Sequence, residues 1–302
     1  MFADAAVDFL NKRKKNDKPF FAFVAFTSPH DPRMKHPEYG HHYNPEDVEL
    51  PVNFLPQHPF DNGELKIRDE VLLPFPRTEA MMKKDLADYY GMISEVDTQI
   101  GRIMNTLREK GELENTIIVF ASDNGLAVGR HGLLGKQNLY EHSISVPMAM
   151  IIPGMEKGTS KDVDCYLYDI YPTLCDLLHI QPAPSVTGKS LLPVLHGATK
   201  HRDQLFLAYN SFQRALVKDG WKYIIYNVDG VITEQLFNLQ TDPDEMVNLA
   251  TDAKYDFKKQ AYKRILKEEM KKNNDFCNLD LHYWMGRPGK MSWDEASKLY
   301  VY

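Results

Sequence analysis

The chain has 302 residues, with 36 Lys and Arg against 42 Asp and Glu, and its formal net charge is -6. A hydrophobic content of 43% is too high for a disordered chain, and the length suffices for one large α/β domain or for a large domain with a small one. The acidic balance argues against general nucleic-acid binding. No apolar run reaches the roughly 18–20 residues of a membrane helix.

The first third of the chain combines clear patterns with one long irregular stretch. Apolar residues from Phe2 to Leu10 recur at helical spacing and predict an amphipathic helix. Residues 20–26 are apolar on both faces, which is typical of a buried strand in a parallel sheet. Residues 27–78 show no periodicity, and a loop of that length is usually functional. Steps of three and four then predict a helix from Glu79 to Lys110, ended by Gly111.

The patterns in the middle of the chain predict part of a parallel sheet. The β-branched run from Thr116 to Phe120 predicts a second strand, and together with residues 20–26 and the long helix it suggests a right-handed βαβ unit. Val146 to Ile152 predicts another buried strand. Asp169 to Leu178 predicts a helix whose first turn contains Pro172.

After about residue 200 the pattern changes to short strands. Asp219-Gly220 marks a tight hairpin turn between two of them, and a Lys-rich helix follows from about Lys254 to Lys271. The expected strands span Leu205–Tyr209, Arg214–Lys218, Trp221–Tyr226 and Gln235–Leu239. We therefore predict a doubly wound, mainly parallel α/β domain over residues 1–200. A small antiparallel α+β subdomain with a helix and a tail is predicted over residues 201–302.

Two polar clusters follow the first two predicted strands. They are Ser28–Arg33 and Ser122–Gly125, and ligands of open α/β sheets bind at the carboxyl ends of the strands. The carboxylate of Asp123 beside the amide of Asn124 suits a hard cation such as Ca²⁺ or Mg²⁺. The alternative for these residues alone is a simple Asp-Asn-Gly turn.

A glycine-punctuated segment, Gly129–Lys136, follows and ends in a single lysine. It is not a P-loop, because Gln137 stands where a Ser or Thr is required. A solvated Lys136 on a surface loop and a purely structural His30 are the alternatives. A metal-ligand pair, a cation and a histidine at one sheet edge together favour a site for an oxyanion ester.

These segments resemble the type I sulfatases of the alkaline-phosphatase superfamily, in the order that the family has them. The similar segments are Pro19–Phe21, Ser28–Pro32, Ser122–Gly125, Gly135–Glu141, Val146-Pro147, Pro153-Gly154, Asp169–Leu174, Gly188–Leu191, Leu236–Leu239 and Asp242–Leu249. The spacing from Asp123 to Lys136 is most similar to the branch of iduronate-2-sulfatase and bacterial carbohydrate sulfatases. Ser145 stands where many relatives have Arg before Val-Pro.

The resemblance implies an alkaline-phosphatase-like fold and hydrolysis of sulfate esters on a sulfated saccharide. It implies that Asp123 and Asn124 bind Ca²⁺, with Mg²⁺ less favoured, and that His30 and Lys136 are catalytic and contact the sulfate. We also predict His131 as a substrate contact. The family's nucleophile is a formylglycine made in a C-x-P-x-R or S-x-P-x-R motif. Its members are commonly periplasmic, secreted or lysosomal, so we expect a periplasmic or secreted protein.

The sequence departs from the family at the nucleophile. None of Cys165, Cys175 and Cys277 begins a C-x-P-x-R motif, and there is no adjacent Asp-Asp pair. The nearest serine version, Ser145–Ala149, lacks the arginine, and so does Thr27–Asp31. We expect either the C-terminal part of a longer sulfatase, which the retained site residues favour, or a degenerate homologue. On both hypotheses the chain alone is catalytically silent, and its apolar faces are incompletely covered.

Two further functions remain open from the sequence. One is a phosphoesterase of the same superfamily, and the other is a non-catalytic protein that binds sulfated glycans. The loop from His36 to His58 and the tail from His282 to Tyr302 are candidate walls of a substrate site.

Overall fold

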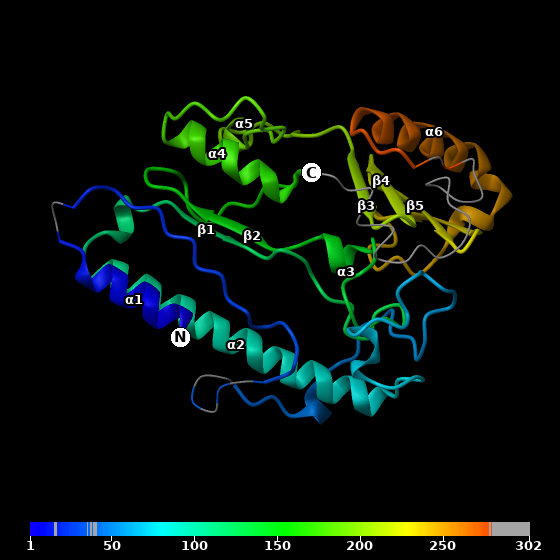
Figure 1. Ribbon diagram of the computed structural model, residues 1–302, viewed down its shortest axis with the longest axis horizontal. Helices are drawn as coiled ribbons and strands as arrows, with labels where there is room; N and C mark the ends of the chain where they lie inside the picture. The colour runs from blue at the N-terminus through cyan, green and yellow to red at the C-terminus, as the bar shows by residue number, and fades with distance from the viewer. Residues whose placement is uncertain (15–16, 35, 37, 39–40, 278, 280–302) are drawn as a thin grey trace, which may run out of the picture.

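The computed structural model describes residues 1–14, 17–34, 36, 38, 41–277 and 279. Helix α1 (Phe2–Lys12) packs along α2 (Glu79–Glu109), as Figure 1 shows. The Arg102 guanidinium ties them together through the Asp4 carboxylate at 2.7 Å. The Thr78 hydroxyl caps α2 by accepting a hydrogen bond from the Met81 N–H. Both helices are confirmed where the periodic patterns predict them.

Residues 20–26 do not form the predicted buried strand, and that expectation is wrong. They lie in no helix or strand, and Phe21 and Phe23 are 80% and 84% exposed. An apolar run becomes a strand only where neighbouring strands accept its hydrogen bonds, and none of the described strands does so. The βαβ unit expected from this run is therefore not formed by the described residues.

The described part of the α/β portion contains one pair of strands. β1 (Ile118–Ala121) pairs antiparallel with β2 (Met148–Ile151), with Ile118 opposite Ile151. Helices α3 (Glu141–Ile144), α4 (Ile170–Leu177) and α5 (Leu192–Leu195) follow. Short 3₁₀ turns lie at Pro45–Asp47, Glu70–Leu72, Leu113–Asn115, Leu167–Asp169, Leu249–Thr251 and Ala253–Tyr255.

A four-stranded antiparallel sheet begins at Leu205, as the sequence predicts. Its order is β3-β4-β5-β6, and its strands are Leu205–Tyr209, Gln213–Lys218, Trp221–Val228 and Val231–Asn238. Asp219 and Gly220 have φ values of 49° and 73°, the left-handed conformation that a two-residue hairpin turn requires. Helix α6 (Asp256–Lys272) lies beside the sheet (Figure 1).

Both faces of this sheet are buried, each against a different part of the chain. Alternate side chains of the strands pack with α6 on one face; they include Leu216, Tyr223, Ile225 and Leu236. The other face packs against residues 127–140; its side chains are Ala215, Ile224, Tyr226 and Phe237. The sheet thus supports the glycine-rich segment from behind. The domain division predicted near residue 200 stays a prediction, because this core joins residues from both sides of it.

Buried ion pairs join the sheet to the rest of the chain. The Lys222 ammonium on β5 is fully buried and contacts the carboxylates of Glu141 and Glu245 at 2.6 and 2.7 Å. The buried Asp169 carboxylate before α4 binds the Arg202 guanidinium, which lies between α5 and β3. No helix that the structure describes combines the length and the apolar character needed to cross a membrane.

Candidate active site

His30 and Lys136 meet in the fold, although they are far apart in the sequence. The Lys136 Nζ atom lies 2.9 Å from His30 Nε2. His30 Nδ1 lies 2.8 Å from an Asp31 carboxylate oxygen and 2.9 Å from the Asp31 carbonyl oxygen. An ammonium can only donate, so Nε2 accepts from Lys136 while Nδ1 carries the hydrogen that it donates to Asp31. The histidine side chain is half exposed, so its ring is open to a ligand.

Two carboxylates and an arginine surround this pair. The Arg68 guanidinium binds both Asp31 oxygens, at 2.9 and 3.2 Å, and also contacts Asp69 at 3.1 Å. The Lys136 Nζ lies 3.7 Å from Asp69, which also accepts a 2.7 Å hydrogen bond from the Gln137 amide. Burial acts to raise the pKa of Asp69, but the Gln137 hydrogen bond and the charges of Lys136 and Arg68 outweigh it and lower that pKa. Asp69 therefore stays ionised beside Lys136.

The backbone that leads into Lys136 is held by a buried ion pair. The Glu70 carboxylate accepts hydrogen bonds from the N–H groups of Leu134 and Gly135, at 2.9 and 2.8 Å. The Arg77 guanidinium binds the same carboxylate at 2.8 Å and donates to the Gly132 carbonyl at 2.6 Å. Both charged side chains are buried. This pair therefore fixes the loop that carries Lys136.

Position 135 requires a glycine because neighbouring side chains approach its backbone closely. A Cβ at this position would lie 2.6 Å from Gln137 Oε1 and 3.0 Å from Asp69 Cβ. Any side chain here would push Asp69 and Gln137 away from Lys136. The sequence pattern of glycines before a lysine thus has a packing reason.

Asp123 and Asn124 lie directly after β1, at the expected strand end. Asp123 Oδ1 accepts a hydrogen bond from the Asn124 N–H at 2.8 Å, and the Asn124 amide donates to the Gly125 carbonyl at 2.9 Å. The second carboxylate oxygen of Asp123 and the amide oxygen of Asn124 accept no hydrogen bond from the described residues. Two adjacent hard oxygen donors are therefore available to a ligand.

These two oxygens fit one side of a site for a hard cation. Ca²⁺ takes six to eight oxygen ligands. The part of the chain that the structure describes contains no group of three or more His, Cys, Asp or Glu side chains that could hold a metal ion. Asp123 and Asn124 can thus contribute to a metal site but do not complete one.

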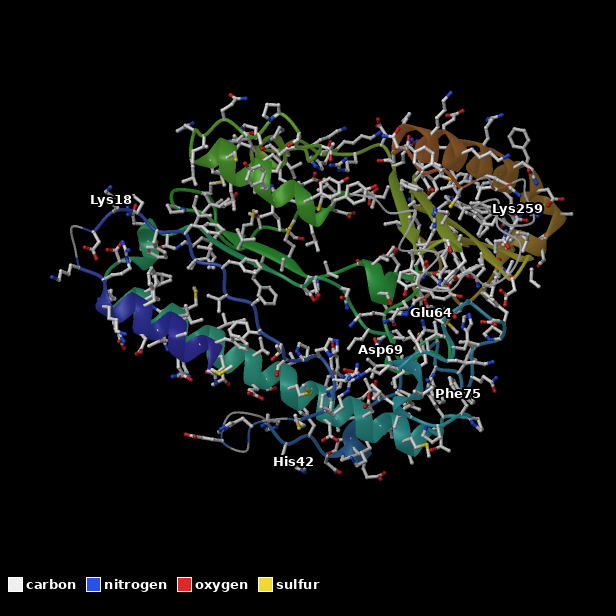
Figure 2. All side chains as sticks on the ribbon, in the orientation of Figure 1. Lys18, His42, Glu64, Asp69, Phe75 and Lys259 are labelled. Carbon is white, nitrogen blue, oxygen red and sulfur yellow. The ribbon has the colours of Figure 1, made fainter. Side chains whose placement is uncertain are left out.

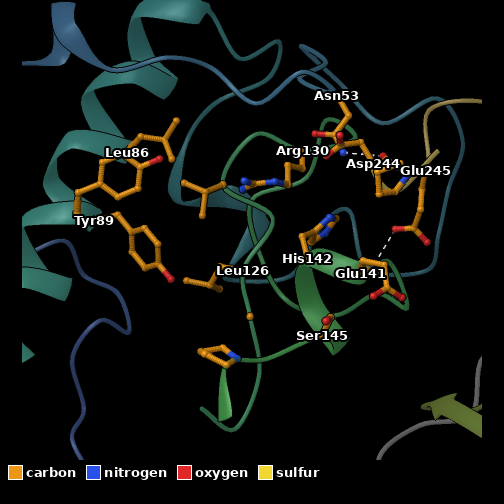
Figure 3. A pocket seen from close by; sticks show the side chains of 15 residues that line it. Asn53, Leu86, Tyr89, Leu126, Arg130, Glu141, His142, Ser145, Asp244 and Glu245 are labelled. Carbon is orange, nitrogen blue, oxygen red and sulfur yellow. Dashed lines mark hydrogen bonds between the residues drawn. The ribbon is translucent and has the colours of Figure 1, made fainter. Parts of the chain in front are cut away.

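A cavity of about 430 Å³ adjoins this strand end (Figure 3). Tyr89, Leu126, Arg130 and His142 are among the side chains that line it, and Gly125 opens into it directly after Asn124. The sequence patterns do not single out this cavity, because its walls come from α2, from the glycine-rich segment and from residues 243–245.

His131 lies in the interior rather than beside His30 and Lys136. Its ring stacks on Tyr140 with centroids 4.0 Å apart, and its Nε2 lies 3.2 Å from the Asn53 amide nitrogen. Burial, together with the nearby charges of His58 and Lys222, lowers the pKa of His131 to about 4. Its predicted contact with the substrate stays a prediction.

Sequence patterns do not identify Asp69, Glu70 and Arg77 as parts of the site. They lie in the stretch without periodicity, and nothing in their spacing distinguishes them from other charged residues. Of the candidate substrate walls, the tail from His282 to Tyr302 lies outside the described residues. The loop from His36 to His58 contributes Asn53 to the cavity.

Two protein-family models match this chain. A family model described as Sulfatase matches residues 1–180, more than half of the chain. The chain belongs to the sulfatase family. A second model, described as N-sulphoglucosamine sulphohydrolase, C-terminal, matches residues 129–274 of this sulfatase chain. The predicted membership is therefore confirmed.

Curated relatives support the same membership. An arylsulfatase of Clostridium perfringens is 32% identical over 275 residues, which are 88% of this chain and 56% of that protein. A sulfatase of Formosa agariphila is 30% identical over 268 residues, which are 85% of this chain and 51% of that protein. The chain thus spans about half the length of these relatives.

Solved structures confirm the alkaline-phosphatase-like fold. A protein solved in complex with its substrate D-glucosamine-2-N,6-O-disulfate has a TM-score of 0.75 and 24% identity, covering 91% of this chain and 69% of that one. A phosphonate monoester hydrolase of Agrobacterium radiobacter has a TM-score of 0.75 and 25% identity, covering 92% of this chain and 62% of that one. The described strands nevertheless pair antiparallel, so the mainly parallel sheet predicted from the sequence is not seen among them.

Proposed function

We propose that this chain binds the sulfate and the leaving group in the hydrolysis of a sulfate ester on a carbohydrate. The contact between Lys136 and His30 carries the proposal, because it places a fixed positive charge and a proton-transfer group at one half-exposed point. Sulfate esters require both, since charge on the sulfate oxygens must be offset and the departing alcohol must be protonated.

The two side chains divide these tasks. The Lys136 ammonium donates hydrogen bonds to a sulfate oxygen, and Asp69 and Gln137 hold it in place. The His30 ring accepts a hydrogen bond from the Lys136 ammonium. A bound sulfate oxygen can take the place of the ring as the acceptor of that hydrogen bond. When His30 is protonated at Nε2 it can give that proton to the bridging oxygen, while Asp31 keeps Nδ1 oriented.

Asp123 and Asn124 would hold Ca²⁺, with Mg²⁺ less favoured because it demands stricter octahedral geometry. A bound dication supplies positive charge that offsets the charge of the sulfate. Asp123 and Asn124 fit this role through the two side-chain oxygens that the described residues leave unengaged.

The nucleophile is not among these groups. We propose that it is a formylglycine, which no C-x-P-x-R or S-x-P-x-R motif of the 302 residues encodes. The 302-residue chain alone is then expected to bind sulfated saccharides without turning them over. The similarity to a protein solved with a sulfated glucosamine supports a sulfated saccharide as the ligand. A periplasmic or secreted location belongs to the same proposal.

Calorimetry with glucosamine 6-O-sulfate in the presence of Ca²⁺ tests this function. We expect wild type to bind it more tightly than unsulfated glucosamine, and Lys136→Ala to weaken binding about tenfold or more by loss of a charge-assisted hydrogen bond. Lys157→Ala is the matched control, because Lys157 is exposed and forms an ion pair with the exposed Glu114. Equal affinity for sulfated and unsulfated sugar, or an unaffected Lys136→Ala variant, would refute the proposal.

A phosphoester is the second candidate substrate. The similarity to the phosphonate monoester hydrolase favours it, since that structure matches as well as the first one. Glucosamine 6-phosphate in the same titration separates the two. Tighter binding of the phosphate ester, with a preference for Zn²⁺ over Ca²⁺, would assign the chain to phosphoester chemistry. If a longer protein that also carries the formylglycine motif bound the sugars without turning them over, a non-catalytic, glycan-binding role would be indicated.

A further inference from the structure

Arg130 places an uncompensated positive charge in the cavity beside the candidate active site. Among the described residues, its guanidinium has one hydrogen-bond partner, the Ala127 carbonyl at 3.5 Å, and no carboxylate forms an ion pair with it. The backbone of Arg130 bridges to Phe54, so the residue is held at the cavity wall. Figure 3 shows its side chain extending toward the space between Tyr89 and His142.

The acidic residues of the cavity do not neutralise this arginine. Glu141 and Glu245 are already bound to the buried Lys222, at 2.6 and 2.7 Å. Asp244 is exposed at the rim. A half-buried guanidinium without a counter-ion favours an anionic ligand, because a bound anion would restore the missing charge pairing.

Two buried polar atoms of the cavity residues also have no partner. Asn53 has an exposed fraction of 7%, and its side-chain oxygen accepts no hydrogen bond from the part of the chain that the structure describes. The Nε2 atom of His142 is buried and also has no partner among the described residues. Buried polar groups are rarely left unsatisfied, so each calls for a hydrogen-bonding ligand or an ordered water.

Another wall of the cavity is aromatic and contacts the segment Ser28–Arg33, which carries His30. Tyr89 and Tyr90 of α2 line the cavity, with ring centroids 6.3 Å apart. The Arg33 guanidinium lies 5.0 Å from the centre of the Tyr89 ring and binds Asp85 at 3.1 Å. The cavity therefore lies between the loop that carries His30 and the turn that carries Asn124.

We propose that this cavity is a second anion-binding subsite, in which Arg130 binds a sulfate or carboxylate substituent away from the reacting ester. This inference rests on the proposed function, because the substituent belongs to the same saccharide. Aromatic faces suit the apolar face of a sugar ring, and Asn53 and His142 suit its hydroxyl groups. The volume lies in the range of small-molecule sites. The subsite selects saccharides with two anionic groups.

Titration of the wild-type chain with three probes tests the subsite and distinguishes its two possible substituents. The probes are glucosamine 6-O-sulfate, glucosamine-2-N,6-O-disulfate, and glucosamine 6-O-sulfate linked to a uronate. We expect one of the two doubly anionic probes to bind about tenfold more tightly than the singly sulfated one, and that probe identifies the substituent. Equal affinity for all three would overturn the inference.

Substitution of Arg130 decides whether this residue is responsible. Arg130→Gln should reduce affinity for the preferred probe about tenfold and for glucosamine 6-O-sulfate less than threefold, and Arg130→Lys should restore part of the loss. Arg264→Gln, at an exposed arginine of α6, is the matched control. Equal losses for both probes in Arg130→Gln would overturn the inference and indicate a structural role.

The Lys136→Ala variant separates this inference from the proposed function. If Lys136→Ala loses affinity for every probe but Arg130→Gln loses none, the subsite is refuted and the proposed function stands. If Arg130→Gln loses its preference but Lys136→Ala binds like wild type, the cavity is an anion site and the sulfatase role of Lys136 is refuted. Failure of wild type to bind any probe would refute both.

Discussion

The Nζ atom of Lys136 lies 2.9 Å from Nε2 of His30, a residue 106 positions earlier in the chain. The contact joins the end of the glycine-rich segment to the turn after residues 20–26. On each side a carboxylate holds one partner, Asp69 for the lysine and Asp31 for the histidine. Around Asp69, the positive charges of Arg68 and Lys136 help to lower the carboxyl pKa. Charged groups are therefore already arranged where the sulfate is proposed to bind.

His30→Ala should weaken sulfate binding less than Lys136→Ala does. The variant removes the acceptor of Lys136 but leaves the positive charge, so we expect affinity for glucosamine 6-O-sulfate to fall by less than about tenfold. Calorimetry measures both variants, with the exposed His196→Ala as the control. A greater loss in His30→Ala than in Lys136→Ala would show that the histidine, not the lysine, provides most of the sulfate affinity.

Arg77→Met should strongly destabilise the fold, because it leaves the Glu70 charge buried without its partner. We expect a loss of about 3–5 kcal/mol in the free energy of unfolding, measured with urea. The exposed Lys84, which pairs with Asp88, is the control, and Lys84→Met should cost less than about 0.5 kcal/mol. The double variant Arg77→Met with Glu70→Leu removes both charges. If it were no more stable than Arg77→Met, the penalty would not come from the unpaired carboxylate.

The sequence predicts those parts of the fold that local patterns determine. The steps of three and four from Glu79 give α2 almost to the residue, and Asp219-Gly220 gives the hairpin between β4 and β5. The strand predicted over residues 20–26 does not form, because a strand depends on neighbouring strands that pair with it. Phe21 and Phe23 are as apolar as a core strand requires, yet the described residues provide no partner strand.

The candidate site is only partly visible in the sequence for the same reason. His30 and Lys136 stand at positions that the family motif marks, although the strand expected before His30 is not formed. The contacts of Glu70 with Leu134 and Gly135 span more than sixty positions and leave no periodic trace. The lining of the cavity likewise depends on how α2 meets the glycine-rich segment.

Stability should fall as the pH is lowered from 6.5 toward 4. Burial lowers the pKa of His58 from 6.5 to about 4, against the hydrogen bond to the His131 carbonyl that raises it. The pKa of His131 is lowered to about 4 as well. Between these pH values the unfolded chain binds more protons than the folded one, so stability is full above pH 6.5 and is lost toward pH 4.

Urea unfolding between pH 7 and pH 4.5 measures this loss. We expect roughly 2–3 kcal/mol from each buried histidine. His58→Gln cannot titrate and should remove about a third of the histidine-dependent slope, because burial lowers the pKa values of His131 and His142 as well. His196→Gln, at an exposed position, should leave the slope unchanged. The same slope in His58→Gln and wild type would contradict a buried neutral His58.

Millimolar Ca²⁺ should stabilise the folded chain through Asp123. A ligand that binds only the folded state raises the free energy of unfolding, here by on the order of 1 kcal/mol because the described residues offer few ligands. Thermal unfolding with and without a chelator measures the shift, and Mg²⁺ should give a smaller one. Asp123→Asn should abolish it, while Asp229→Asn, in an exposed hairpin turn, should not. Equal shifts in both variants would place the cation elsewhere.

Phe21→Ser combined with Phe23→Ser should reduce self-association without lowering stability. Both rings are more than three-quarters exposed, so replacing them removes no packed core and should change the free energy of unfolding by less than about 0.5 kcal/mol. Light scattering at rising protein concentration measures the association. Phe257→Ser is the matched control, because Phe257 on α6 is 89% exposed but lies on a helix that covers the four-stranded sheet. If Phe257→Ser reduced the association as much, general surface apolarity rather than the uncovered run at residues 20–26 would be its cause. Figure 2 shows side chains crowded around the four-stranded sheet and α6.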